Sequence, residues 1–348
     1  MQAYYLTPET RIEGIPGTVL GLVARTGEEP RPSAGQVCMR VHAAALNFVD
    51  LVFLSGGVPG LSGLVPLIDG AGEIVAVGAG VTQVAVGDRV VANPHQSWIA
   101  GELSPESSGV YLGGTVNGML AEYAVLPEHG VVRMPAHLSF AEAAALPCAG
   151  MSAWSSVTGG ARRLGVIPGE TVLIQGTGGV SLFALQFAKL LGARVIATTS
   201  TAAKAERMKA MGAEAVINYV DHPDWGAKTL ELTGGRGVDL VVEVGGANTL
   251  PQSIQCTRAG GRIAMLGIVA GMGAVEFSRL TPIMQKALVL FGNSTGSRAD
   301  LVNMIRAIEL HQLRPVVDKV FPFAQAADAY RHFASRAHVG KVVISVSR

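Results

Sequence analysis

The sequence pattern with the clearest chemistry is a glycine-rich turn at residues 176–181, Gly-Thr-Gly-Gly-Val-Ser. An apolar run typical of a buried strand precedes it, and a stretch with the spacing of an amphipathic helix follows it. In this setting a glycine turn presents backbone N–H groups and a helix N-terminus to a pyrophosphate. The alternative interpretation is a tight strand-to-helix turn that binds nothing. We predict that a dinucleotide contacts the six residues of the turn: Gly176, Thr177, Gly178, Gly179, Val180 and Ser181.

Within this turn, Gly176 is expected to allow the tight bend and Gly178 to let the phosphates approach the backbone. Ser181 stands where a third glycine usually lets the helix pack closely on the strand. Serine is a small residue and therefore the nearest to a tolerable substitute. Its hydroxyl could also reach a phosphate oxygen.

The segment after the second predicted strand, Arg194–Thr199, indicates which dinucleotide binds. An NAD site usually carries an acidic residue about 20 residues beyond the glycines, where it binds the ribose 2′-hydroxyl. Here no Asp or Glu occurs between Ser181 and Lys204, and hydroxyl side chains are followed by Lys204 and Arg207. Cations form charge-assisted hydrogen bonds with a 2′-phosphate, so we predict NADP(H), with Ser200 and Lys204 at that phosphate. In the alternative, Ser200 only caps the next helix and Lys204 is solvated; the two roles can coexist.

Two different sequence patterns of apolar residues predict two domains in the chain that contains this turn. Up to about Pro127, short strands separated by glycine-containing turns are typical of a small β-barrel or sandwich. From Ser139 to Ser294, apolar runs alternate with helical stretches, which predicts a parallel, doubly wound α/β sheet. A polar insertion at 94–118 has the length of a mobile loop or a binding-site wall. The runs predicted as strands of the parallel sheet are Val172–Gln175, Arg194–Thr199, Ala215–Asn218, Val238–Val244, Arg262–Gly267 and Leu288–Phe291.

Short sequence motifs predict where several helices and one strand begin or end. Gly192 and Gly212 stand where C-terminal helix caps are expected. Residues 297–300, Ser-Arg-Ala-Asp, have the form of a capping box and predict a helix that stops before Pro315. The tail at 339–346, VGKVVISV, predicts a strand that returns to the first domain. The predicted domains are 1–128 with 294–348, and 129–293.

Composition argues against several classes of partner. The chain has 348 residues, a net charge of +1 and only 15% charged residues, so no strong field attracts nucleic acid or an anionic membrane. The N-terminus lacks the pattern of a signal peptide, and the longest uncharged apolar stretch, 263–275, is too short to span a bilayer. Three cysteines without paired spacing argue against disulfides and a cysteine-type structural zinc site. We expect a cytoplasmic protein that acts on a small molecule.

The chain from about residue 17 onward resembles the medium-chain dehydrogenase/reductase superfamily, in its quinone-oxidoreductase-like branch. The resemblance implies a GroES-like β-barrel domain and a Rossmann domain, with the active site in the cleft between them. Besides the glycine turn, the motifs that carry it are ALNFVD (45–50), DGAGEIVAVG (69–78), GDRVV (87–91), AAALPCAGMSAW (143–154), VINY (216–219) and GKVVI (340–344).

Many members of this superfamily are zinc alcohol dehydrogenases, but the resemblance argues against zinc here. Their three catalytic ligands fall on Asn47, near Ile68, and on Cys148, and a single thiolate cannot hold Zn²⁺. The lobe that carries structural zinc would lie at 93–118, which has no cysteine. We expect both metals to be absent and Cys148 to be a small buried residue. Without Zn²⁺ as Lewis acid, electron-poor acceptors such as quinones and α,β-unsaturated carbonyls become the expected substrates.

The resemblance also implies roles for single residues. Asn47 and Ser152 would lie near the nicotinamide; Asn47 either donates a hydrogen bond to the acceptor oxygen or only positions the cofactor. Tyr219 would lie beside the 2′-phosphate. The proton donor stays open among water, Tyr111 and His95. The remaining residues expected at the cofactor are Gly245, Leu266, Gly267, Gly340 and Lys341.

The leading functional hypothesis is an NADPH-dependent, zinc-independent oxidoreductase that transfers hydride to a quinone or an α,β-unsaturated carbonyl. One alternative is a reductase or dehydrogenase of an activated ketone, an alcohol or an enoyl thioester. Another is a non-catalytic protein that only binds NADPH. Relatives often pair through the last strand of the Rossmann sheet, here 287–291, so we expect a homodimer.

Overall fold

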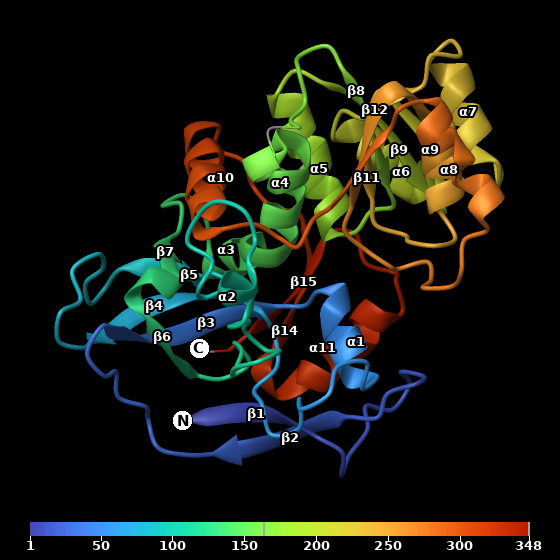
Figure 1. Cartoon of the computed structure of the whole chain (residues 1–348). Coiled ribbons are helices and arrows are strands. Elements are labelled where there is room, and N and C mark those ends of the chain that lie inside the picture. The colour runs from blue at the N-terminus through green and yellow to red at the C-terminus, as the bar shows by residue number, and fades with distance from the viewer. Residues whose placement is uncertain (163, 347–348) are drawn as a thin grey trace. The chain divides into compact units, whose positions relative to one another are not determined.

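The computed structural model describes residues 1–162 and 164–346 (Figure 1). The chain divides into two compact units: unit 1 comprises Met1–Met151 with Gly296–Arg348, and unit 2 comprises Ser152–Thr295. Residues 129–151, which the sequence pattern had placed in the second domain, group with unit 1. The last two residues of the segment predicted as 294–348 lie outside the described residues. No helix in the described ranges combines the length and apolarity needed to cross a membrane.

Unit 1 is built mainly from antiparallel strands. A two-stranded sheet pairs β1 (Gln2–Thr7) with β2 (Gly21–Thr26), and a seven-stranded sheet has the order β14-β15-β3-β4-β5-β7, with β6 paired to β3. The strand β1 lies in a segment for which no strand was predicted. The other strands of unit 1 are β3 (Gln36–Ala45), β4 (Asp69–Val77), β5 (Arg89–Ala92), β6 (Tyr123–Pro127), β7 (Val131–Arg133), β14 (Val317–Pro322) and β15 (Lys341–Ser345). Its helices are α1 (Phe48–Leu54), α2 (Pro105–Ser108), α3 (Phe140–Ala144), α10 (Arg298–Leu310) and α11 (Ala326–Ala334), with a π-helical turn at Leu146–Gly150.

The C-terminal strand β15 lies between β14 and β3 within unit 1. It runs antiparallel to β3, with Val343 opposite Ala45, and the Leu46 N–H donates to the Val342 carbonyl at 3.0 Å. The prediction that the tail returns to the first domain is confirmed. This register places Lys341, the first residue of β15, next to the end of β3, where Asn47 begins the turn into α1.

Unit 2 is a six-stranded sheet with the order β10-β9-β8-β11-β12-β13, and every strand pair in it is parallel. The chain order reverses between β8 and β11, which is the point where doubly wound sheets bind ligands at the carboxyl ends of their strands. The predicted α/β class and all six predicted strands are confirmed. The strands are β8 (Thr171–Gln175), β9 (Arg194–Thr199), β10 (Ala215–Asn218), β11 (Val238–Glu243), β12 (Thr257–Met265) and β13 (Val289–Gly292). The helices are α4 (Met151–Thr158), α5 (Gly179–Leu190), α6 (Ala202–Ala210), α7 (Trp225–Leu232), α8 (Leu250–Cys256) and α9 (Thr281–Gln285).

The predicted helix boundaries agree with the structure. Gly192 and Gly212 follow α5 and α6 with φ angles of +77° and +96°, a conformation that glycine adopts without strain. The Ser297 side chain accepts from the Asp300 N–H, and the Asp300 carboxylate accepts from the Ser297 N–H at 2.9 Å. This capping box starts α10, as predicted.

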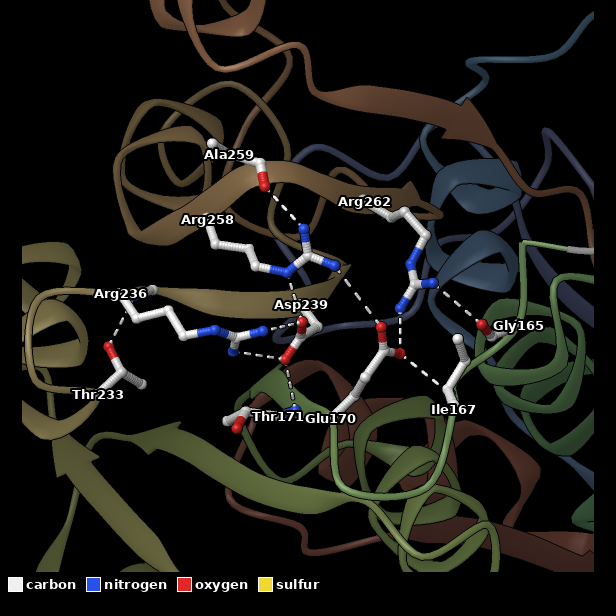
Figure 2. Close-up of polar contacts among 11 residues, drawn as sticks. Gly165, Ile167, Glu170, Thr171, Thr233, Arg236, Asp239, Arg258, Ala259 and Arg262 are labelled. Atoms are coloured by element: carbon white, nitrogen blue, oxygen red, sulfur yellow. Dashed lines mark hydrogen bonds and ion pairs between the residues drawn. The ribbon is translucent and has the colours of Figure 1, made fainter.

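A charged network ties together the amino ends of the central strands in unit 2 (Figure 2). The Asp239 carboxylate accepts from the guanidinium groups of Arg236 and Arg258 and, at 2.8 Å, from the Thr171 N–H at the start of β8. Hydrogen bonds from Arg236 and Arg258 hold the pKa of Asp239 well below its usual range, against the effect of burial. Glu170 continues the network between Arg258 and Arg262. The network therefore holds together the amino ends of the central strands, whereas the glycine turn lies at the carboxyl end of β8.

Candidate active site

The glycine turn after β8 leaves room for a ligand at its backbone. Gly176 has a φ of +73°, and among the described residues none comes within 4 Å of a Cβ built on Gly176 or Gly178. Gly178 is the N-cap of α5, and in the described structure no side chain caps the first N–H groups of that helix. Unsatisfied N–H groups at a helix start, facing open space, form an anion site. The turn therefore fits a pyrophosphate.

Ser181 has a role that the sequence did not indicate. Its hydroxyl donates to the Gln175 carbonyl at 2.6 Å, and the residue is only 2% exposed. The hydroxyl thus joins the first turn of α5 to the end of β8. This contact corrects the expectation that the hydroxyl would reach a phosphate oxygen, and it explains how a serine is accommodated where glycine is usual.

The carboxyl ends of β9 and β10 bring predicted 2′-phosphate residues together. The Tyr219 N–H donates to the Thr199 carbonyl at 2.9 Å, so Tyr219 lies beside the residue that precedes Ser200. Tyr219 is 43% exposed, and Ser200 is half-buried. The cap of α6 is Thr201, whose side chain accepts from the Lys204 N–H at 3.3 Å. The alternative in which Ser200 caps this helix is therefore wrong.

A buried carboxylate that sequence reasoning missed orders the loop after β11. Glu243 accepts at 2.8 Å and 3.0 Å from the N–H groups of Gly245 and Gly246, and at 2.6 Å from the Thr249 hydroxyl. Its other oxygen accepts from the Gln175 amide at 2.7 Å and from the Ser253 hydroxyl. The only signal in the sequence was an acidic residue at the end of an apolar strand. Glu243 thereby fixes the backbone of Gly245, a predicted cofactor residue, at the point where the strand order reverses.

The predicted residues after β12 lie against this loop. The Leu266 N–H donates to the Glu243 carbonyl at 2.9 Å. A Cβ on Gly267 would lie 2.4 Å from the Val244 carbonyl oxygen, so only glycine fits there. Ser152, also in unit 2, is buried in α4, and its carbonyl accepts from the Asn293 amide at 3.0 Å.

In unit 1, Asn47, Asp69 and Lys341 form a buried charged cluster. The Lys341 ammonium donates to Asn47 Oδ1 at 2.6 Å and to Asp69 Oδ2 at 2.9 Å, and Asn47 Nδ2 donates to Asp69 Oδ2 at 2.9 Å. Asp69 Oδ1 accepts from the Cys148 N–H at 2.8 Å. Lys341 is 2% and Asp69 0% exposed. The structure therefore brings together Asn47 and Lys341, which were each predicted to lie at the cofactor but not to contact one another, and adds Asp69, which was not predicted.

Two features hold this cluster in place. Gly340 has a φ of +91°, and a Cβ there would lie 2.2 Å from the Val316 carbonyl oxygen, so glycine is required immediately before Lys341. An oxygen of the Asp50 carboxyl group accepts from the Asn47 N–H at 2.7 Å, at the start of α1. Burial raises the pKa of Asp50 to about 8, so this carboxyl group is protonated at neutral pH.

Cys148 and Tyr111 lie at the side of the same cluster. Burial raises the pKa of the Cys148 thiol well above its ordinary value, so the group is a neutral thiol rather than a metal-binding or nucleophilic thiolate. Tyr111 and Cys148 both pack against the core of unit 1. The His95 ring packs on Tyr111 with 4.5 Å between ring centroids, and burial lowers the pKa of His95 to about 4. The three side chains are thus neutral at pH 7.

The positions at which the resemblance places zinc ligands have other roles. Asn47 is bonded to Lys341 and Asp69, and Ile68 is fully buried in the core. Within residues 1–162 and 164–346, no three His, Cys, Asp or Glu side chains are placed to hold a metal ion.

Comparison with known proteins identifies the family. The family model described as "Alcohol dehydrogenase GroES-like domain" matches residues 33–136, and the one described as "Zinc-binding dehydrogenase" matches residues 179–309. A zinc-type alcohol dehydrogenase-like protein of Schizosaccharomyces pombe is 42% identical over 90% of this chain and 91% of its own length. The chain belongs to the medium-chain dehydrogenase/reductase superfamily. It is therefore an oxidoreductase with a GroES-like domain and a Rossmann domain.

The names of further relatives state different substrates and cofactors. A quinone oxidoreductase of Pseudomonas aeruginosa is 32% identical over 92% of this chain and 94% of its own. A solved structure named NAD-dependent alcohol dehydrogenase is 37% identical, covers 100% of both chains and has a TM-score of 0.86. A mycobacterial protein complexed with NADPH is 29% identical, with 99% of each chain covered and a TM-score of 0.79. The names of the two solved structures both include a nicotinamide cofactor, but one names NAD and the other NADPH.

Proposed function

We propose that this protein is an NADPH-dependent, zinc-independent reductase that transfers hydride to a quinone or an α,β-unsaturated carbonyl. One observation carries the proposal: the Asn47 amide is bonded to both Lys341 and Asp69, beside a neutral Cys148 thiol. Unit 1 therefore offers hydrogen-bond donors, rather than metal ligands, at this position. Hydrogen bonds polarise a carbonyl less than Zn²⁺ does, which favours acceptors that are already electron-poor.

The preference for NADPH is supported by the surroundings of β9. The strand ends at Thr199 and is followed by Ser200 and Thr201, none of them acidic, and Lys204 lies in the first turn of the next helix. Tyr219 presents an exposed ring beside them. The glycine turn would hold the pyrophosphate and these side chains the 2′-phosphate; when bound, the cofactor supplies hydride. The mycobacterial structure with NADPH supports this choice, and the NAD-dependent structure is the reason to measure it.

The test is consumption of NADPH and of NADH against quinones, enones, saturated ketones, simple alcohols in the reverse direction and acyl-CoA thioesters. We expect the fastest turnover with NADPH and a quinone or enone, with full activity after treatment with a chelator. Faster oxidation of ethanol, or about one zinc per chain by elemental analysis, would contradict the proposal. Tight NADPH binding without turnover of any acceptor would instead favour the non-catalytic alternative.

The proposal includes a cytoplasmic homodimer. The strand β13 is an edge of the six-stranded sheet, and in the segment that precedes it in the chain Met272, Phe277 and Met284 are each at least two-thirds exposed. An open strand edge and exposed apolar side chains both suit pairing with a second copy. Light scattering coupled to size-exclusion chromatography would measure the mass, and a monomer at micromolar concentration would contradict the dimer.

A further inference from the structure

Tyr111 lies in the insertion at 94–118 and is held firmly at the buried cluster. Its N–H donates to the Thr115 hydroxyl at 2.8 Å, and its carbonyl accepts from the Thr115 N–H at 2.9 Å. Its ring packs against the core of unit 1, together with Cys148. The insertion therefore places the Tyr111 phenol against the same core as Cys148, whose N–H donates to Asp69 of the cluster.

His95, whose ring packs on Tyr111, is a second sign that a ligand binds here. The residue is 5% exposed, and neither of its ring nitrogens has a hydrogen-bond partner among the described residues. Buried polar atoms almost always have a partner, so two unsatisfied nitrogens on one buried ring need an explanation. A polar group of a bound molecule beside Tyr111 would supply one.

We propose that Tyr111 is a catalytic residue that donates the proton to the acceptor oxygen of the substrate. This inference rests on the proposed function, in which a quinone or an unsaturated carbonyl accepts hydride. As the acceptor gains an electron pair, negative charge develops on its oxygen. The Tyr111 O–H bond then breaks and a new O–H bond forms on the substrate, leaving a phenolate that takes a proton from water.

A carbonyl oxygen with growing negative charge is a strong acceptor for a phenolic hydroxyl such as that of Tyr111. Burial raises the pKa of Tyr111 well above its ordinary value, so the hydroxyl keeps its proton at neutral pH.

Other groups nearby are less suited to give up a proton. Lys341 is bonded to Asp69 and Asn47. His95 is neutral, because burial lowers its pKa to about 4.

The first test compares Tyr111→Phe with Tyr123→Phe, which removes a hydroxyl from a tyrosine of β6 whose ring stacks on Arg40. With NADPH and either 1,4-benzoquinone or cyclohex-2-enone, we expect kcat/KM of Tyr111→Phe to fall about 10²- to 10⁴-fold. Tyr123→Phe should stay within about twofold of wild type, and NADPH affinity should be unchanged in both. A solvent deuterium isotope effect on wild-type kcat should accompany the proton transfer. A Tyr111→Phe enzyme as active as Tyr123→Phe would overturn the inference.

The second test needs neither cofactor nor turnover. Cofactor-free protein labelled with ¹³C at the tyrosine ζ carbon is titrated with cyclohexanone, a carbonyl without a conjugated double bond. We expect one resonance to shift, namely the one that is missing from the Tyr111→Phe spectrum. If no acceptor is reduced but this shift is seen, the proposed function fails while the contact of Tyr111 with a carbonyl stands. If acceptors are reduced but the resonance does not move, the role of Tyr111 is wrong and the proposed function stands.

Discussion

Replacing Lys341 by methionine tests how much the buried cluster contributes to stability. The substitution keeps an unbranched side chain only one atom shorter, but it leaves Asp69 as a fully buried carboxylate with two donors, the Asn47 amide and the Cys148 N–H. Removing one partner of a buried ion pair typically costs about 3–5 kcal/mol, because the remaining charge is uncompensated. One kcal/mol lowers Tm by about 2–4 °C in a domain of roughly 150–250 residues, so we expect a loss of about 6–20 °C.

The assay is thermal and urea unfolding of wild type, Lys341→Met, Asp69→Asn and the double variant, with Arg133→Met as control. Arg133 belongs to the same unit and pairs with Asp88 at 2.7 Å, but its side chain is 60% exposed, so its loss should cost at most about 1 kcal/mol. The double variant should be more stable than the sum of the single losses predicts, since it leaves no unpaired charge. The reasoning would be refuted by equal losses of stability in Lys341→Met and Arg133→Met. It would also be refuted if the loss of stability in the double variant equalled the sum of the losses in the two single variants.

Three further predictions concern unit 2. Lys204→Ala should weaken the affinity for NADPH about 10- to 150-fold, which corresponds to roughly 1.5–3 kcal/mol for a charge-assisted contact, and leave the affinity for NADH nearly unchanged. Adding Ser200→Asp should reverse the preference between the two cofactors. An equal loss of affinity for both cofactors in a fluorescence titration would argue against a 2′-phosphate site. Gly178→Val should weaken both cofactors alike, because its side chain would enter the open space at the turn, and a variant that still binds either one normally would exclude this space as the pyrophosphate site. Asp239→Asn should cost about 1–3 kcal/mol at pH 7, allowing for its partly exposed arginine partners. Because folding lowers the pKa of Asp239, its ionised form contributes fully to the free energy of unfolding above its unfolded-state pKa near 4, and this contribution is lost as the pH falls toward the folded-state pKa. The difference in stability between wild type and Asp239→Asn should therefore shrink in acid. A constant difference from pH 7 to pH 3 would contradict this.

Features that depend on neighbouring residues in the sequence could be predicted. The strands of unit 2, the glycine caps after α5 and α6 and the capping box at Ser297 all follow from local pattern and local hydrogen bonds. The glycine turn was recognisable because backbone conformation at Gly176 is dictated within a few residues. Such signals are present in the chain before it folds.

Features that depend on the fold could not be read in the same way. Asp69 and Lys341 are 272 residues apart, and they meet only because β15 pairs with β3. Gln175 and Glu243 are 68 residues apart and meet because β8 neighbours β11. In each case a polar residue in or beside an apolar strand is visible in the sequence, but its partner is not. The N-cap of α6 is Thr201 rather than Ser200. Both residues carry a hydroxyl that can cap a helix, so the sequence does not show at which of the two the helix begins.

The partners of Asn47 explain why an amide suits this position better than a metal ligand. Lys341 has only donors and needs an acceptor, while the Asp69 carboxylate accepts and needs donors. One planar amide meets both needs, and the two bonds determine which end of it faces which partner. A cysteine there would lose both bonds and place a thiol against an ammonium group, and an aspartate would add a carboxyl group beside Asp69 and Asp50. The residue at 47 is therefore coupled to the lysine at 341 and to Asp69 through these hydrogen bonds.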